Sequence, residues 1–305
     1  MVNLGGVIAA NGNSQKKTFH NINKISMSHD VLTVDYKDPI APSKLEVSLR
    51  SSGFALIKNH PISRELISRA YEEWESFFND KNKFNYLYNK KTQDGYFPFL
   101  TENAKNSSVK DLKEFYHYYP WGRLPSRLCE STITLYNDLV NLSSELLQWI
   151  ESSCPAHIKK NFSVPLKSMI SGSQSNLFRI IHYPPLGKNA DKKALRAAPH
   201  EDINLITVLL AGSEPGLQAM DTNGKWHDIS CDKNMLVVNS GDMLSMASNN
   251  YYPSTTHRVI NPQKSKNVSR YSMPLFLHPK DSVVLNETYT ARSYLDERLK
   301  EIGLK

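Results

Sequence analysis

The sequence lacks the features typical of a secreted or membrane-embedded protein. Its three cysteines are an odd number without CxxC spacing, which favours free thiols in a reducing compartment. No apolar run approaches the roughly 18 residues that a membrane-spanning helix needs. No basic region precedes the mildly apolar segment 4–10, so we expect no signal peptide. We therefore predict a cytoplasmic protein without a membrane partner.

Nucleic-acid-binding motifs are also lacking. The formal net charge is +7, but the basic residues are scattered along the chain rather than gathered in one stripe. This distribution argues against a nucleic-acid partner. The positive charge favours solubility, and it would also attract an anionic substrate or co-substrate. The sequence contains no signal for a particular oligomeric state.

The length and composition suit one large domain. A chain of 305 residues could hold one large domain or two small ones, and 40% apolar residues are enough for a sizeable core. No internal repeat or low-complexity tract is present. Residues 1–25 are polar and without hydrophobic period, which predicts a flexible tail. We expect residues 26–305 to form a single domain.

Short strands at close spacing occur in the second half of the chain. Asn223-Gly224 lies between two apolar runs, residues 217–220 and 226–229, and predicts a hairpin in which both turn residues take positive φ. Residues 235–239 and 243–246 are predicted to be two further strands joined by a turn. Such spacing favours antiparallel, jelly-roll-like pairing over a parallel sheet.

Three segments have the hydrophobic period of a helix. Between residues 126 and 152, leucines recur at three- and four-residue steps until Pro155 ends the pattern. A second helix is expected after Ser63, which can act as its N-cap. Residues 290–301 predict a third, amphipathic helix. The whole chain is therefore expected to be mainly β with flanking helices.

Two histidines and one carboxylate have the spacing of a metal site. The segment after Asp202 is rich in Ile, Leu, Val and Thr, which predicts a buried strand. On this strand His200 and Asp202 would project from the same face, with Cα atoms roughly 6–7 Å apart. His257 must be brought in from another strand. Two imidazoles and one carboxylate on one side of a metal leave its opposite side open, an arrangement that fits non-haem Fe(II) used for oxygen chemistry.

An Arg-x-Ser pair follows the second of these histidines. On a strand, Arg270 and Ser272 would face the same side, with Tyr271 opposed. A guanidinium can pair with a carboxylate through two parallel hydrogen bonds, and a hydroxyl can add another. We therefore predict an anion site. A single His-x-Asp occurs often by chance, so the prediction depends on the combined pattern.

These segments resemble the iron- and 2-oxoglutarate-dependent dioxygenases, in particular the isopenicillin N synthase-like branch. Further similar segments are residues 53–60, 179–185 and 239–244, and they occur in the family's order between residues 28 and 300. The resemblance implies a distorted double-stranded β-helix, or jelly roll, whose metal-binding core spans about residues 175–280. It also implies that the long helix braces this core from outside.

The resemblance further implies Fe(II), 2-oxoglutarate as co-substrate, and O2. The expected reaction is hydroxylation or desaturation of a small metabolite, coupled to decarboxylation of 2-oxoglutarate to succinate. Arg270 and Ser272 would then bind the distal carboxylate of 2-oxoglutarate, and by resemblance Tyr183 adds a contact. Three further residues could line the pocket or support the ligands: Arg179, Asn239 and Arg258.

Two alternatives remain open at this point. An isopenicillin N synthase-like Fe(II) oxidase keeps an Arg-x-Ser pair without using 2-oxoglutarate, and a jelly-roll protein could bind a metabolite without catalysis. The chain also departs from plant members of the family. It has Ile181 where they commonly carry Asn, and Asn204 where they usually carry Gly. These departures weaken any transfer of substrate identity.

Overall fold

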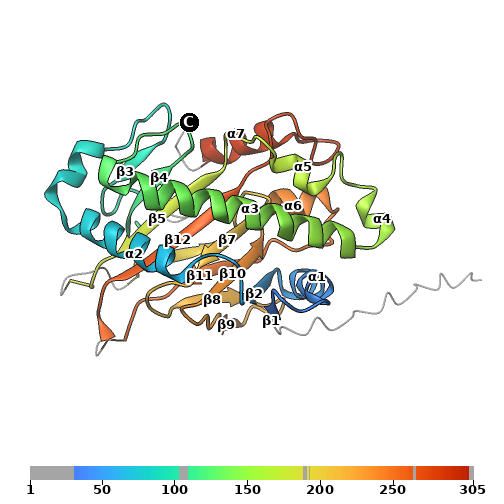
Figure 1. The fold of residues 1–305 in the computed structure, drawn as a ribbon, viewed down its shortest axis with the longest axis horizontal. Helices are drawn as coiled ribbons and strands as arrows, with labels where there is room; N and C mark the ends of the chain where they lie inside the picture. Colours follow the sequence, from blue (N-terminus) through green and yellow to red (C-terminus); the bar gives the residue numbers. More distant parts are fainter. Residues whose placement is uncertain (1–30, 103–108, 188–190, 192, 264–265, 302–305) are drawn as a thin grey trace, which may run out of the picture.

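Figure 1 shows two packed sheets with helices around them. The computed structural model describes residues 31–102, 109–187, 191, 193–263 and 266–301. The predicted tail, residues 1–25, lies outside these ranges. Within them the prediction of a mainly β protein with flanking helices is confirmed.

The strands form one large and one small sheet. The large sheet has eight strands in the order β1-β2-β10-β7-β12-β5-β4-β3, and the small sheet has four in the order β6-β11-β8-β9. Apart from the parallel pair β1 and β2, the neighbouring strands are antiparallel, as predicted. The large sheet contains β1 (Leu32–Asp35), β2 (Phe54–Lys58), β3 (Gly95–Phe97), β4 (Glu114–Tyr118), β5 (Leu177–Tyr183), β7 (Ile206–Leu210), β10 (Met235–Ser240) and β12 (Arg270–Leu277). The small sheet contains β6 (Ala197–His200), β8 (Leu217–Met220), β9 (Trp226–Asp228) and β11 (His257–Val259).

Helices cover the outer face of the large sheet. The longest, α3, runs across this sheet and packs its leucine-rich face inward (Figure 1). None of the described helices is long and apolar enough to cross a membrane. The helices are α1 (Ala41–Ser52), α2 (Arg64–Asn79), α3 (Cys129–Ser153), α4 (Ala156–Lys159), α5 (Leu166–Ile170), α6 (Asp242–Ala247) and α7 (Ala291–Glu301), with short 3-10 helices η1 (Lys81–Tyr86) and η2 (Ser126–Leu128).

The three helices predicted from the sequence are present. Helix α3 buries Leu135, Leu139 and Leu146 completely, and burying one such side chain contributes roughly 1.5–3 kcal/mol. The hydroxyl of Ser63 accepts a hydrogen bond from the Leu66 amide at 3.1 Å, so Ser63 is the N-cap of α2. Helix α1 was not predicted, because it buries few large apolar residues.

Two separate hydrophobic clusters lie on the two faces of the large sheet. One cluster joins the sheet to the helices and includes Trp74 of α2. The other lies between the two sheets, where Phe115 of β4 and Val237 of β10 meet Ala219 and Val259 of the small sheet. Because successive strand residues point to opposite faces, the inner face of each strand is defined by this second cluster.

Residues 243–246 form part of helix α6, so their predicted strand is wrong. The amides of Gly241, Asp242 and Met243 donate to the carbonyls of Leu205, Asp202 and Asn204 rather than to a neighbouring strand. These bonds satisfy the free amides at the start of α6 and turn the chain out of the sheet. A Cβ at Gly241 would lie 2.2 Å from the Asn204 carbonyl oxygen, so only glycine allows this approach.

The predicted hairpin between β8 and β9 is present, but its turn differs in detail. Gly224 has a φ of 79°, whereas Asn223 does not have positive φ. The side chain of Asp221 instead accepts hydrogen bonds from the amides of Asn223 and Lys225, at 2.8 and 2.9 Å. This Asx-type turn needs the left-handed conformation only at Gly224.

A buried carboxylate joins three elements on the outer face of the large sheet. Glu114 of β4 accepts hydrogen bonds from Lys83 at 2.8 Å and from His182 of β5 at 2.7 Å, and a third from Tyr96 of β3. Burial opposes ionisation of Glu114, but these donors outweigh burial and hold its pKa below the usual 4.5. The ionised carboxylate therefore stabilises the folded state.

We predict that Glu114→Gln lowers the free energy of unfolding at pH 7 by about 3 kcal/mol, because it leaves buried donors without their charged partner. A lowered folded pKa means that this stability is present above about pH 4.5 and is lost as the pH falls through the folded pKa. Denaturant titrations of both proteins should therefore converge at low pH. An equal difference at pH 7 and pH 3 would contradict the role of the charge.

Candidate metal centre

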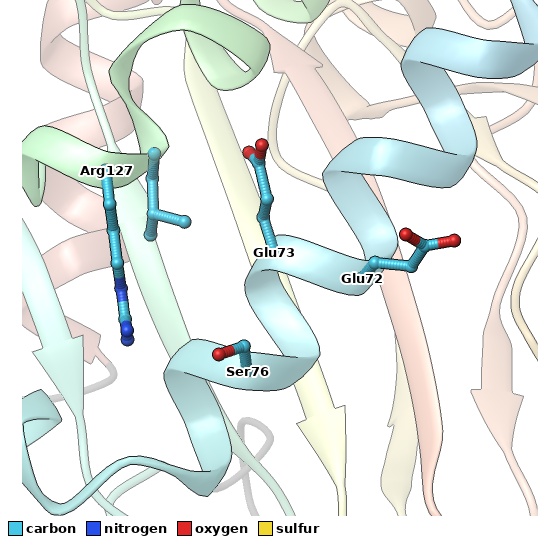
Figure 2. A pocket seen from close by; sticks show the side chains of 5 residues that line it. Glu72, Glu73, Ser76 and Arg127 are labelled. Carbon is cyan, nitrogen blue, oxygen red and sulfur yellow. The ribbon is translucent and has the colours of Figure 1, made fainter.

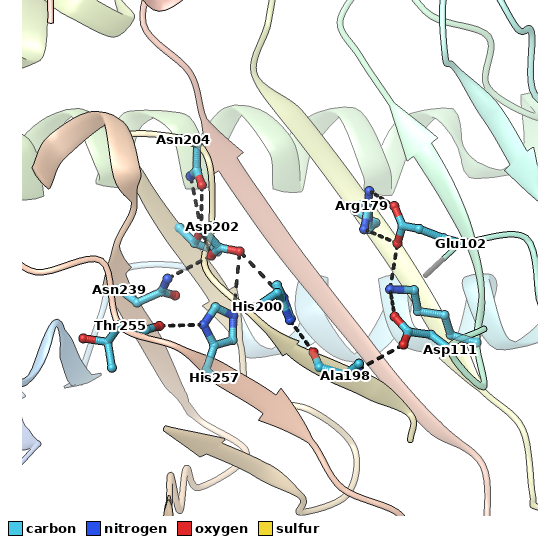
Figure 3. Close-up of polar contacts among 12 residues, drawn as sticks. Glu102, Asp111, Arg179, Ala198, His200, Asp202, Asn204, Asn239, Thr255 and His257 are labelled. Carbon is cyan, nitrogen blue, oxygen red and sulfur yellow. Dashed lines mark hydrogen bonds and ion pairs between the residues drawn. The ribbon is translucent and has the colours of Figure 1, made fainter. Parts of the chain in front are cut away.

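His200, Asp202 and His257 come together between the two sheets, as Figure 3 shows. His200 ends β6 and His257 begins β11, and the two residues are direct partners in the antiparallel pairing of these strands. The Nε2 atoms of His200 and His257 lie 4.0 and 3.7 Å from Oδ1 of Asp202. The three possible ligand atoms all lie within 4.8 Å of one another.

The prediction that His200 and Asp202 share one strand is wrong. Strand β6 ends at His200, and Asp202 lies in the connection before β7. The Asp202 carbonyl accepts the amide of Asp242 at 2.8 Å, which holds this connection against the start of α6. The two side chains converge because of this packing rather than because of strand alternation.

Backbone carbonyls fix the orientation of both imidazoles. Nδ1 of His200 donates to the Ala198 carbonyl at 2.8 Å, and Nδ1 of His257 donates to the Thr255 carbonyl at 3.1 Å. Each Nε2 therefore keeps a free lone pair that faces Asp202, the arrangement usual for metal-binding histidines. Burial and the neighbouring His257 lower the pKa of His200 to about 4, which keeps this imidazole neutral at pH 7.

The carboxylate of Asp202 is oriented by two neighbouring strands. Its Oδ2 accepts hydrogen bonds from Thr207 Oγ1 of β7 and from Asn239 Nδ2 of β10, the latter at 2.8 Å. Thr207 and Asn239 are paired residues of the two antiparallel strands. Burial would raise the pKa of Asp202, but both imidazoles and these hydrogen bonds lower it. Oδ1 is thus left facing the imidazoles as an ionised donor.

Asn204 supports this arrangement from the connection itself. Its Nδ2 donates to the Ile206 carbonyl and to Thr207 Oγ1, at 2.6 and 3.1 Å. It therefore helps to place the hydroxyl that binds Asp202. Sequence reasoning noted Asn204 only as a departure from plant members of the family, and nothing in the local pattern indicated this role.

The three donors fit a ferrous ion. Two imidazole nitrogens and one carboxylate oxygen converge from one side, which suits Fe(II) with open coordination positions. The side chain of His200 is 36% exposed, against 10% for His257 and 5% for Asp202. Ligands other than protein side chains can therefore approach from the His200 side.

The predicted anion site lies on the inner face of the large sheet. Arg270 of β12 pairs in register with Tyr183 of β5, and Ser272 lies two residues further along β12. All three are 3% exposed. The Arg270 guanidinium lies 5.2 Å from the Tyr183 ring centroid, and its Nε donates to the Glu214 carbonyl at 2.9 Å. Among the described residues its Nη1 has no hydrogen-bond partner.

Gly212 allows the guanidinium of Arg270 to occupy this place. A Cβ at Gly212 would lie 2.6 Å from Nη2 and 2.9 Å from Cζ of Arg270. The backbone of Gly212 therefore packs directly on the Arg270 guanidinium. Sequence reasoning did not identify this glycine.

Arg179 belongs to a buried cluster of four charged residues. Its Nη1 and Nη2 each lie 3.1 Å from an oxygen of Glu102, and its Nε donates to Nε2 of His117 at 2.9 Å. Lys113 contacts both Glu102 at 2.7 Å and Asp111 at 2.9 Å. Burial and the positive charge of Arg179 hold the pKa of His117 well below its usual value, which suits an imidazole that accepts from the guanidinium.

This cluster is connected to a candidate metal ligand. Oδ1 of Asp111 accepts a hydrogen bond from the Ala198 amide at 3.0 Å. The carbonyl of Ala198 in turn accepts a hydrogen bond from Nδ1 of His200 (Figure 3). The hydrogen bonds therefore run without a break from Arg179 to His200.

Arg258 is not part of the site. Its guanidinium lies 3.9 Å from the Trp226 ring centroid, and its Nε donates to Gln218 at 2.9 Å. Both partners belong to the neighbouring strands β8 and β9. As the next residue on β11, Arg258 points to the face opposite His257.

A hollow of about 270 Å³ lies elsewhere, between α2 and η2 (Figure 2). It is lined by Glu72, Glu73, Ser76, Arg127 and Leu128. Arg127 is paired with Asp80, and Glu73 accepts a hydrogen bond from Ser131. These groups already have partners, so the hollow does not compete with the His-Asp-His cluster as a candidate site.

Two family models match the chain. The 2OG-Fe(II) oxygenase superfamily matches residues 174–279, and the N-terminal part of non-haem dioxygenases in morphine synthesis matches residues 25–132. A solved structure from Shewanella oneidensis, assigned as an oxygenase, is 49% identical with a TM-score of 0.82. It covers 90% of this chain and 100% of that protein.

Two curated relatives are more distant. Jasmonate-induced oxygenase 1 of Arabidopsis thaliana is 27% identical over 79% of this chain. Isopenicillin N synthase of Streptomyces clavuligerus is 28% identical over 56% of this chain. The chain spans 60% and 55% of the lengths of these two relatives.

We predict that Thr207→Val lowers the affinity for Fe(II) by about 10- to 100-fold, because it removes a hydrogen bond that orients Asp202 while conserving side-chain volume. Anaerobic equilibrium dialysis would measure the affinity. The matched control is Thr222→Val, at an exposed position in the β8–β9 turn. If Thr207→Val and the control bind Fe(II) with equal affinity, the hydrogen bond from Thr207 to Oδ2 of Asp202 does not contribute to metal binding.

Proposed function

The chain belongs to the 2OG-Fe(II) oxygenase superfamily and is an oxidoreductase of that type, and we propose that His200, Asp202 and His257 hold its Fe(II). The predicted family resemblance and the jelly-roll core with flanking helices are confirmed. The single observation that supports the metal assignment most strongly is the convergence of two Nε2 atoms and Oδ1.

We propose that this enzyme hydroxylates or desaturates a small molecule while 2-oxoglutarate is converted to succinate and carbon dioxide. When bound, Fe(II) and 2-oxoglutarate supply the activation of O2. The protein's own residues orient the reactants. Asp202 and the two histidines hold the metal from one side, and the anion site around Arg270 and Ser272 would receive the distal carboxylate of 2-oxoglutarate.

Tyr183 contributes to this anion site through its ring. The ring lies against the Arg270 guanidinium and keeps that side free of water. A buried guanidinium with an unpaired Nη1 is costly unless an anion binds, and this supports assigning Arg270 to the co-substrate. Asn239 acts indirectly, by fixing the orientation of Asp202.

The substrate is proposed to contact the inner surface formed by β4 and β5. Phe115 and Ile181 supply apolar side chains there, and the Arg179 guanidinium beside them is held in place by Glu102 and His117. The Arg179 guanidinium stacks 4.6 Å from the Phe115 ring centroid, so the polar and apolar groups are adjacent. The net charge of +7 belongs to the whole chain, and it favours the approach of a small, anionic metabolite.

We further propose that residues 26–305 form one domain with a metal-binding core at about 175–280, and that the protein acts in the cytoplasm. The eight-stranded sheet, which joins β1–β4 of the first half of the chain to β5, β7, β10 and β12 of the second half, supports one domain. The free cysteines Cys129, Cys154 and Cys231 support a reducing compartment.

The reaction can be tested without knowing the substrate. Fe(II)-loaded enzyme should consume O2 and release succinate from 2-oxoglutarate, and a metabolite screen should reveal compounds that increase succinate release. If O2 uptake and substrate oxidation proceed equally without 2-oxoglutarate, the protein is instead an oxidase of the isopenicillin N synthase kind. Absence of anaerobic Fe(II) binding would indicate a non-catalytic binding protein.

We predict that Gly212→Ala raises the 2-oxoglutarate concentration needed for half-maximal succinate release by about 10-fold or more. The added methyl group would displace the Arg270 guanidinium, so that its two parallel N–H donors no longer face the carboxylate of 2-oxoglutarate. Steady-state kinetics would measure this effect. Gly187→Ala is the matched control, because a Cβ there meets no atom within 4 Å. Unchanged co-substrate dependence in Gly212→Ala would contradict the placement of Arg270.

A further inference from the structure

Arg196 is a fully buried arginine that forms no ion pair within the part of the chain that the structure describes. It is 1% exposed and is among the largest completely buried side chains of the protein. Its Nη2 donates to the Val268 carbonyl, and its backbone amide donates to Asn261 Oδ1 at 3.0 Å. Its Nε has no hydrogen-bond partner among the described residues. A buried guanidinium with an unused donor is costly unless another group binds it.

Arg196 and Arg270 lie beside the same aromatic ring. Their Cζ atoms lie 6.0 and 5.2 Å from the ring centroid of Tyr183. Each guanidinium has a buried nitrogen without a hydrogen-bond partner, and among the residues that the structure describes neither guanidinium forms an ion pair with a carboxylate. One anion bound beside the Tyr183 ring would therefore stabilise both buried positive charges.

Electrostatics agree with this geometry. Burial, followed by repulsion from Arg270, lowers the pKa of Arg196 to about 10, although a nearby carboxylate and phenol act in the opposite direction. The protein thus holds like charges close together in a poorly solvated place. Natural proteins rarely bury a charge that is left unpaired.

We propose that Arg196 is a second cationic anchor for the distal carboxylate of 2-oxoglutarate, acting together with Arg270. One carboxylate has two oxygens with about four lone-pair sites, so it can accept hydrogen bonds from two guanidiniums. The free Nε of Arg196 and the free Nη1 of Arg270 are the donors in question. This inference rests on the proposed use of Arg270 as the co-substrate anchor.

A purely structural role would use different atoms. The bonds to Val268 and Asn261 tie the segment before β6 to the segment before β12, and they need only Nη2 and the backbone amide. Such a tie would affect folding stability but not the preference for a dicarboxylate. The distal carboxylate is therefore the group to vary in a test.

The experiment compares two 2-oxo acids on the anaerobic, Fe(II)-loaded protein by calorimetry. 2-Oxoglutarate carries the distal carboxylate, and 2-oxopentanoate has a methyl group in its place. We expect Arg196→Gln to weaken binding of 2-oxoglutarate by about 10- to 100-fold and to change binding of 2-oxopentanoate by less than about 3-fold. Arg196→Lys keeps the charge and should show a smaller loss. Arg69→Gln, on the surface of α2, removes the same charge elsewhere and should match the wild type.

The outcomes are distinguishable. Unchanged 2-oxoglutarate affinity in Arg196→Gln and Arg196→Lys, or an equal loss for both acids, would overturn the proposal while leaving Arg270 as the anchor. If Arg196→Gln does not fold, Arg196→Lys decides alone. If the wild-type protein itself binds 2-oxoglutarate no better than 2-oxopentanoate, the proposed co-substrate site fails together with the role of Arg196.

Discussion

The candidate site depends on the different partners of the two carboxylate oxygens of Asp202. Thr207 and Asn239, which face each other on β7 and β10, both donate to Oδ2. Oδ1 is consequently the oxygen that faces the Nε2 atoms of His200 and His257. The large sheet thus orients a ligand that belongs to neither sheet, and the small sheet supplies the two histidines. The paired strands therefore fix the orientation of the proposed metal ligand Asp202.

Hydrogen bonds and ion pairs also fix the orientation of other polar side chains on the inner surface of the large sheet. The imidazole of His200 is tied through Ala198 to Asp111, and from there through Lys113 to the cluster around Arg179. Buried ion pairs contribute little net stability, because desolvation offsets their attraction, but they strongly disfavour other arrangements. The cluster therefore acts mainly by fixing geometry, and it connects the proposed substrate surface to the candidate metal centre.

Sequence patterns were sufficient where the physical cause is local. The leucine period of α3, the N-cap at Ser63 and the Asn-Gly hairpin follow from short-range preferences. The pairing of His200 with His257 could be anticipated only from the combined motif. The strand expected at residues 243–246 is a helix because its first amides bond to residues 202–205, a contact that no local pattern encodes. The burial of Arg196 was not predicted from the sequence, because it arises only from tertiary packing.

The most direct test is a crystal structure of the protein loaded anaerobically with Fe(II) and 2-oxoglutarate. The account predicts one iron bound by Nε2 of His200, Nε2 of His257 and Oδ1 of Asp202, with Oδ2 still accepting hydrogen bonds from Thr207 and Asn239. An iron bound through Oδ2, through an Nδ1 atom, or at a place apart from these residues would contradict it.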